Sequence, residues 1–191
     1  MGFDNLKRPL FNERRTLINY PAVVMQIDQD AQAVIFDDDP KRYMARIGTI
    51  SPEDRQIRVT RSVSTIVQFR VLDYGMEWCD LQLTIPLNSD DSVQICDGNM
   101  ALAIHRLNAS SLLNGKKLGY KARPARVSKI AEIELSKMKD VDFRRRVSCR
   151  MGEVLTFEIV HSSVESDCYV EWWQDPDKST TAVYVVQHST A

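Results

Sequence analysis

The sequence predicts an all-β protein, a jelly-roll-like antiparallel β-sandwich of about nine or ten strands preceded by an N-terminal arm. The first observation is that apolar and polar residues alternate with a period of two over many short segments, which is typical of half-buried strands. The second is that turn-forming sequences, such as Asp97-Gly98, separate these segments at nearly regular intervals. The chain has no repeat or linker. We therefore expect one domain over residues 20–191, with residues 1–19 as an arm laid on it.

Two segments favour short helices, residues 13–19 and residues 108–113. The alternation is clearest over residues 79–85, where the odd positions are apolar and the even positions are polar. Pro86 ends that segment, because proline cannot donate a hydrogen bond to a ladder. The candidate strands cover residues 22–27, 31–36, 43–50, 56–61, 62–71, 79–85, 100–104, 131–135, 155–159, 168–173 and 181–187.

Composition narrows the classes of partner. Hydrophobic residues make up 43% of the 191 residues, which is ordinary for a globular domain with its own core. Lys and Arg number 25 against 26 Asp and Glu, so the formal charge of −1 gives no footprint for nucleic acid or for an anionic membrane. The run Arg144, Arg145 and Arg146 is expected to be a solvated loop. We expect neither nucleic acid nor membrane as a partner.

The amino terminus and the cysteines predict a cytoplasmic protein. The first residues are polar and lack the apolar core of a secretory signal. The cysteines, Cys79, Cys96, Cys149 and Cys168, are not spaced as metal-binding pairs and are expected to be reduced thiols. With three histidines, none of them near a cysteine, the sequence predicts no metal and no cofactor.

Several short motifs occur in a fixed order: CDLQLTIP at 79–86, IHRL at 104–107, PARVSKI at 124–130, TFEI at 156–159 and CYVEWWQD at 168–175. Over roughly residues 60–190, this order resembles the C-terminal β-sandwich domain of fungal ubiquitin-fold-binding proteins, the But group. Small stand-alone intracellular fungal proteins are more closely similar, and bacterial modules with a "tWnnrP" segment are more distantly similar. The resemblance implies a sandwich fold and brings no catalytic residue. Where the family tends to have Trp-Asn before the proline, this chain has Gly119-Tyr120-Lys121-Ala122-Arg123.

The segment Trp172-Trp173 carries the candidate ligand site. Successive residues of a strand face opposite sides, so Trp172 is expected in the core with Cys168 and Val170. Trp173 is then expected to be partly exposed beside Tyr169, Glu171 and Asp175. An aromatic ring flanked by carboxylates suits stacking on a sugar and accepting hydrogen bonds from its hydroxyls. Plain packing of Trp173 under a loop or under the arm is the alternative.

Two other groups have weaker functional readings. The acidic run of Asp37, Asp38 and Asp39 supplies oxygens of the kind that Ca²⁺ prefers, although turn formation explains it as well. His105 together with Cys96 or Cys149 would make a nucleophile and base pair if the fold joined them.

The leading hypothesis is a non-enzymatic cytoplasmic binding module with lectin-like recognition of a carbohydrate. One alternative is a small cofactor-independent enzyme, cyclase- or isomerase-like, that holds a hydrophobic small molecule in a cavity of the sandwich. The other is a protein-interaction domain that uses edge strands or the arm to form a homodimer.

Overall fold

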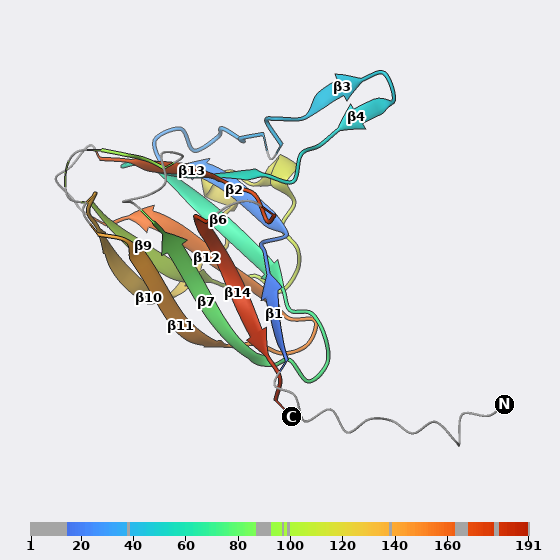
Figure 1. The fold of residues 1–191 in the computed structure, drawn as a ribbon. Helices are drawn as coiled ribbons and strands as arrows, with labels where there is room; N and C mark the ends of the chain where they lie inside the picture. The colour runs from blue at the N-terminus through green and yellow to red at the C-terminus, as the bar shows by residue number, and fades with distance from the viewer. Residues whose placement is uncertain are drawn as a thin grey trace.

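The structure is a computed structural model that describes residues 15–37, 39–86, 93–96, 98, 100–137, 139–162, 168–177 and 180–190. It confirms the predicted antiparallel β-sandwich, with a four-stranded and a five-stranded sheet packed face to face (Figure 1). Most of the predicted arm, residues 1–14, lies outside the described residues.

The four-stranded sheet lies in front in Figure 1 and has the order β1-β14-β7-β11. Its strands are β1 (Thr16–Asn19), β14 (Ala182–His188), β7 (Trp78–Ile85) and β11 (Val141–Ser148). The five-stranded sheet has the order β10-β9-β12-β6-β2. Its strands are β10 (Arg126–Leu135), β9 (Met100–Leu107), β12 (Val154–His161), β6 (Val63–Arg70) and β2 (Val23–Asp28). All of these pairings are antiparallel.

Two smaller sheets complete the described fold. A three-stranded sheet joins β5 (Arg55–Val59), β13 (Val170–Gln174) and β8 (Gln94–Ile95), and it adds Ile57, Val170 and Trp172 to the core. A hairpin of β3 (Tyr43–Ala45) and β4 (Gly48–Ile50) stands away from the sandwich.

The inward-facing residues of both large sheets form one hydrophobic cluster. Leu81 and Leu83 of β7 meet Phe69 of β6 and Phe157 of β12, all without exposed surface. The rings of Phe69 and Phe157 contact edge to face, with their centroids 6.2 Å apart. The alternation of residues 79–85 therefore gave the correct inward face for β7.

The outer faces of the two large sheets differ. The connection from β9 to β10 contains the short 3₁₀ helices η2 (Gly115–Lys117) and η3 (Tyr120–Ala122), and it covers part of the five-stranded sheet. Its Leu118 packs on Met25, Ile27 and Ile66 of that sheet. No described segment crosses in front of β7 and β14 in Figure 1, so the outer face of the four-stranded sheet is open there.

Several local predictions were wrong. Residues 31–36 form a turn and irregular chain instead of a strand, with the Val34 amide bonded to the carbonyl of Ala31. Residues 16–19, predicted to be helical, form strand β1, because pairing with β14 overrides the weak helical signal. Residues 108–113 contain no helix.

The basic run is the most consequential of these errors. Arg144, Arg145 and Arg146 lie in the middle of strand β11, opposite β7, and not in a loop. The sequence shows no alternation here, because residues on both faces of β11 are charged. Arg144 and Arg146 point outward, and Arg145 is on the inner face, where the position of β11 at the edge of the sheet leaves it exposed.

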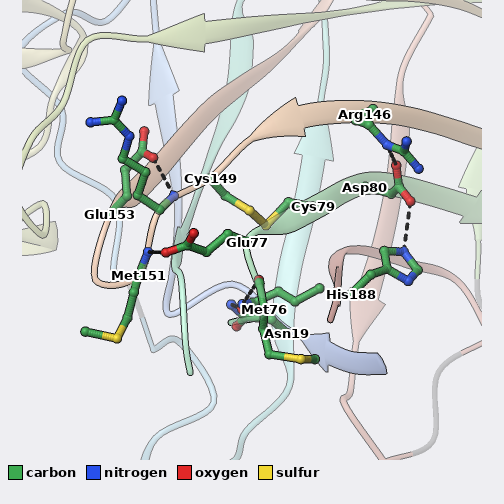
Figure 2. The surroundings of a disulfide bond; sticks show 12 residues. Asn19, Met76, Glu77, Cys79, Asp80, Arg146, Cys149, Met151, Glu153 and His188 are labelled. Atoms are coloured by element: carbon green, nitrogen blue, oxygen red, sulfur yellow. Dashed lines mark hydrogen bonds and ion pairs between the residues drawn. A yellow bond between two sulfur atoms is a disulfide. The ribbon is translucent and has the colours of Figure 1, made fainter. Parts of the chain in front are cut away.

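The prediction of reduced thiols was also wrong. Disulfides join Cys79 to Cys149 and Cys96 to Cys168, with Cα–Cα distances of 6.0 and 5.3 Å, and Figure 2 shows the first of them. Each bond spans about 70 residues of sequence, so no local spacing indicated the pairing. Cys79 and Cys168 are buried, as predicted.

The disulfides generate the first testable prediction. Protein made under oxidising conditions and titrated with Ellman's reagent in denaturant should show no thiol, whereas reduced protein should show four. Replacing Cys79 and Cys149 together by Ser should lower the free energy of unfolding by about 2–5 kcal/mol. Without the bond, the unfolded chain regains the conformational entropy that closing the loop had removed. Four thiols in the oxidised, unmodified protein would contradict the pairing.

Candidate functional site

The residues of strand β13 alternate between the core and the outer side, as the sequence predicted. Trp172 has no exposed surface and packs with Val170 in the core, so this prediction is confirmed. Glu171 and Trp173 lie on the other face of the strand and are partly buried. Tyr169, just before the strand, is 40% exposed.

The polar groups around Trp173 already have partners. The ammonium of Lys41 lies 3.7 Å from the centroid of the Trp173 ring. Gln56 donates to Glu171 at 2.5 Å, and the Arg58 Nε is 3.5 Å from the same carboxylate. Asp175 accepts the amide of Asp177 in a turn. Ligand binding by Tyr169, Glu171, Trp173 and Asp175 stays a prediction.

The acidic run and the histidine hypothesis have different outcomes. Asp37 accepts the amide of Asp39 at 3.0 Å, which is the turn interaction expected of aspartate, and Asp38 lies outside the described residues. The described part of the chain contains no group of three or more His, Cys, Asp or Glu side chains that could hold a metal ion. The pairing of His105 with a cysteine thiol was wrong, because Cys96 and Cys149 are in disulfides.

A second candidate site, which the sequence reasoning missed, lies on the open face of the four-stranded sheet. We call Asp80, Arg144, Arg146 and His188 the Asp80 cluster. Asp80 on β7 stands opposite Arg146 on β11 in the ladder, and His188 ends the neighbouring strand β14. Figure 2 shows the carboxylate of Asp80 between Arg146 and His188.

The Asp80 carboxylate is the centre of this cluster. Its side chain is only 2% exposed, whereas the side chains of Arg144 and Arg146 are 54% and 63% exposed. The Nε of Arg146 donates to Asp80 Oδ1 at 3.3 Å, and Arg144 donates to Oδ2. The Nε2 of His188 lies 2.9 Å from Oδ2.

Electrostatics keep Asp80 ionised. Burial raises its pKa, but the hydrogen bonds and charges of Arg144 and Arg146 outweigh burial, so the pKa lies below its ordinary value. The carboxylate thereby holds two half-exposed guanidinium groups in fixed positions.

Apolar and aromatic side chains surround the cluster on the same sheet. Trp78 is 56% exposed, and the guanidinium of Arg146 lies 5.2 Å from its ring centroid. Ile18 of β1 is also more than half exposed. Tyr184 of β14 contacts Tyr20 at a centroid distance of 6.0 Å. This face combines exposed apolar area with fixed positive charge.

The five-stranded sheet has a comparable carboxylate with a different use. Glu158 is fully buried and accepts hydrogen bonds from Arg123, Arg126 and Ser64 at 2.7–3.0 Å. Burial raises its pKa, but the hydrogen bonds and charges of the arginines outweigh burial, so the pKa lies below its ordinary value. Arg123 lies at the end of the covering connection and Arg126 begins β10, so Glu158 fastens the end of that connection to the sheet.

Two comparisons bear on identity. The family model described as the "Ubiquitin 3 binding protein But2 C-terminal domain" matches residues 48–178. That range runs from β4 to just beyond β13 and includes Trp78, Asp80 and all of β11. A search of curated proteins found no match.

The pKa of Asp80 generates the second prediction. Asp80→Asn should lower the free energy of unfolding by about 1–3 kcal/mol at pH 7, because hydrogen bonds to a charged group are lost. Since the pKa of Asp80 is lower in the folded state, its contribution is present above the unfolded pKa of about 3.9 and disappears as the pH falls through the folded value. Urea denaturation at pH 7 and pH 3 should show the difference narrowing at pH 3.

The control for this prediction is Asp142→Asn, an exposed carboxylate on the same face of β11. This substitution should change stability by no more than about 0.5 kcal/mol at pH 7. An equal loss for Asp80→Asn at both pH values would show that the charge of Asp80 contributes nothing.

Proposed function

Because the chain belongs to the family of But2 C-terminal domains, we propose that it is a protein-binding module and that the open face of the four-stranded sheet is its docking surface. The observation that carries this proposal is the combination of exposed Trp78 with arginines that Asp80 holds in place. Trp and Arg are the residues that most often dominate binding energy at protein interfaces.

The charge at the Trp78 end of the face selects the chemistry of the partner. There Arg144 and Arg146 bring two positive charges against the one negative charge of Asp80, and Trp78 and Ile18 offer apolar area beside them, whereas Asp142 lies farther along β11 from Trp78. A partner that presents acidic side chains around an apolar centre complements this surface. The family description speaks of a ubiquitin 3 binding protein, which makes ubiquitin the first partner to test.

The disulfides change the proposed location. The expectation of a cytoplasmic protein depended on the polar amino terminus and on reduced cysteines, and the two bonds remove the second of these supports. Disulfides persist in oxidising compartments, so we propose that the domain acts in one of them. In the described residues, no helix has the length and apolarity needed to cross a membrane.

Lectin-like recognition at strand β13 is the second candidate. The observation in its favour is that Tyr169 is exposed on the side where Glu171 and Trp173 also lie. The enzyme alternative gains no such support. The surface hollows, with volumes of about 120–380 Å³, are open to solvent, whereas that reaction needs an enclosed apolar cavity.

The carbohydrate candidate leads to a prediction about neighbouring tryptophans. Trp172→Ala should cost about 3–5 kcal/mol of stability, because a buried ring leaves a cavity. Trp173→Ala should stay within about 0.5 kcal/mol and should abolish binding on a glycan array. Equal destabilisation by the two substitutions, or no glycan bound by the unmodified protein, would remove the candidate.

The protein-binding proposal is tested by titrating ubiquitin into the oxidised domain and measuring the heat of binding. Trp78→Ala should weaken the affinity by at least about tenfold, because truncating a central aromatic residue commonly costs that much or more. Tyr43→Ala is the matched control, since Tyr43 is 53% exposed but lies on the distant hairpin. No binding would exclude ubiquitin as the partner, and binding that Trp78→Ala leaves unchanged would overturn the assigned surface.

A further inference from the structure

We propose that the hollow beside the Asp80 cluster is a binding site for a tetrahedral oxyanion, a phosphate or sulfate monoester. The inference deepens the proposed function, on which it rests for the source of the anion, a modified residue of the protein partner. The binding of the anion itself depends only on the hollow.

The hollow lies at the end of the four-stranded sheet near the described C-terminal residues. It has a volume of about 380 Å³ and is open to solvent. Its lining residues are Arg15, Trp78, Arg144, Arg146, His188, Ser189 and Thr190. A water molecule occupies about 30 Å³ in the liquid, so the hollow has room for a tetrahedral anion together with the first atoms of the group that carries it.

The arginines keep donors for such an anion after binding Asp80. A guanidinium has five N–H groups in a planar fork. Arg146 uses its Nε on Asp80 and Arg144 uses one terminal nitrogen, and both side chains are more than half exposed. The remaining N–H groups therefore include donors that solvent can reach. Paired N–H donors of this kind match the oxygens of phosphate and sulfate.

The hollow is ordered before any anion arrives. Asp80 fixes both arginines, and the ring of Trp78 lies under Arg146. At the rim, the Ser189 amide donates to the carbonyl of Arg15 at 2.9 Å, which ties the start of β1 to the end of β14. Side chains that are already held lose less conformational freedom on binding, so more of the interaction energy remains as affinity.

The balance of charge favours an anion. The lining brings the guanidinium groups of Arg144 and Arg146, and the buried Asp80 behind them supplies one negative charge, so this pair keeps a net positive charge. Monoesters of phosphate and of sulfate are both anions at neutral pH, and that of phosphate carries about −1.5 to −2 charges at pH 7.

The experiment uses inorganic phosphate and inorganic sulfate as probes. Each is titrated into the full oxidised chain while the Nε–H signals of the arginines are followed by NMR, with acetate at the same ionic strength as the comparison. Phosphate and sulfate should saturate the signals of Arg144 and Arg146, and acetate should not. Arg146→Gln should weaken binding by at least about tenfold.

Arg145→Gln provides a matched control, because it removes the same charge one residue away from a side chain on the other face of β11. It should change the affinity by less than about twofold, since exposed charges outside the contact are screened. Equal weakening by Arg145→Gln and Arg146→Gln, an equal response to acetate, or no response to either oxyanion would overturn the site.

Peptides containing phosphoserine or sulfotyrosine identify the source of the anion, because only the accepted modification should compete with the inorganic probe. The two proposals also fail in different ways. Saturable phosphate binding without ubiquitin binding would refute ubiquitin as the partner and keep the hollow. Ubiquitin binding that depends on Trp78, in a protein that binds no phosphate or sulfate, would refute the hollow and keep the docking surface.

Discussion

The requirement that a buried carboxylate be paired organises both outer faces of this sandwich. Asp80 and Glu158 stand on inner strands of opposite sheets, and each is held by two arginines. Removing one partner from such a group costs more than the pair contributes, so both clusters constrain the fold around them. The faces differ in where their arginines come from. At Glu158, Arg123 belongs to the covering connection and Arg126 begins β10 just after it, whereas the arginines of Asp80 come from the adjacent strand and stay exposed to solvent.

This difference explains why one face is structural and the other is free to bind. Arg123 at Glu158 has a side chain only 19% exposed and stacks on Tyr120, so its role is to fasten chain to sheet. The side chains of Arg144 and Arg146 are also held by a buried carboxylate, yet they present donors to solvent. The disulfide from Cys79 to Cys149 ties the end of β11 to β7 beside this cluster (Figure 2), which further limits movement of the arginines.

The sequence predicted the parts of the fold that depend on local alternation. The inward face of β7 and the burial of Trp172 followed from the period of two. Strand β11 was not predicted, because its three successive arginines give no alternation. The cluster around Asp80 was missed for the same reason, since both of its arginines belong to β11. The disulfides were not predicted, because cysteines about 70 residues apart in the sequence meet only through tertiary structure. The signal that was present was an acidic residue inside an apolar strand together with arginines two positions apart, Arg144 and Arg146, which places both of them on one face.

The formal charge of −1 for the whole chain suggested a protein without electrostatic preference, but the relevant field is local. At physiological ionic strength, the screening length is about 8 Å, so acidic residues elsewhere contribute little to the potential above the Asp80 cluster. Arg144 and Arg146 beside the hollow therefore act on a partner as a positive patch, although the chain as a whole is balanced. Added salt should screen the charges of the exposed arginines more strongly than the charge of the buried carboxylate behind them. Association with an acidic partner should accordingly weaken with salt while the cluster itself persists.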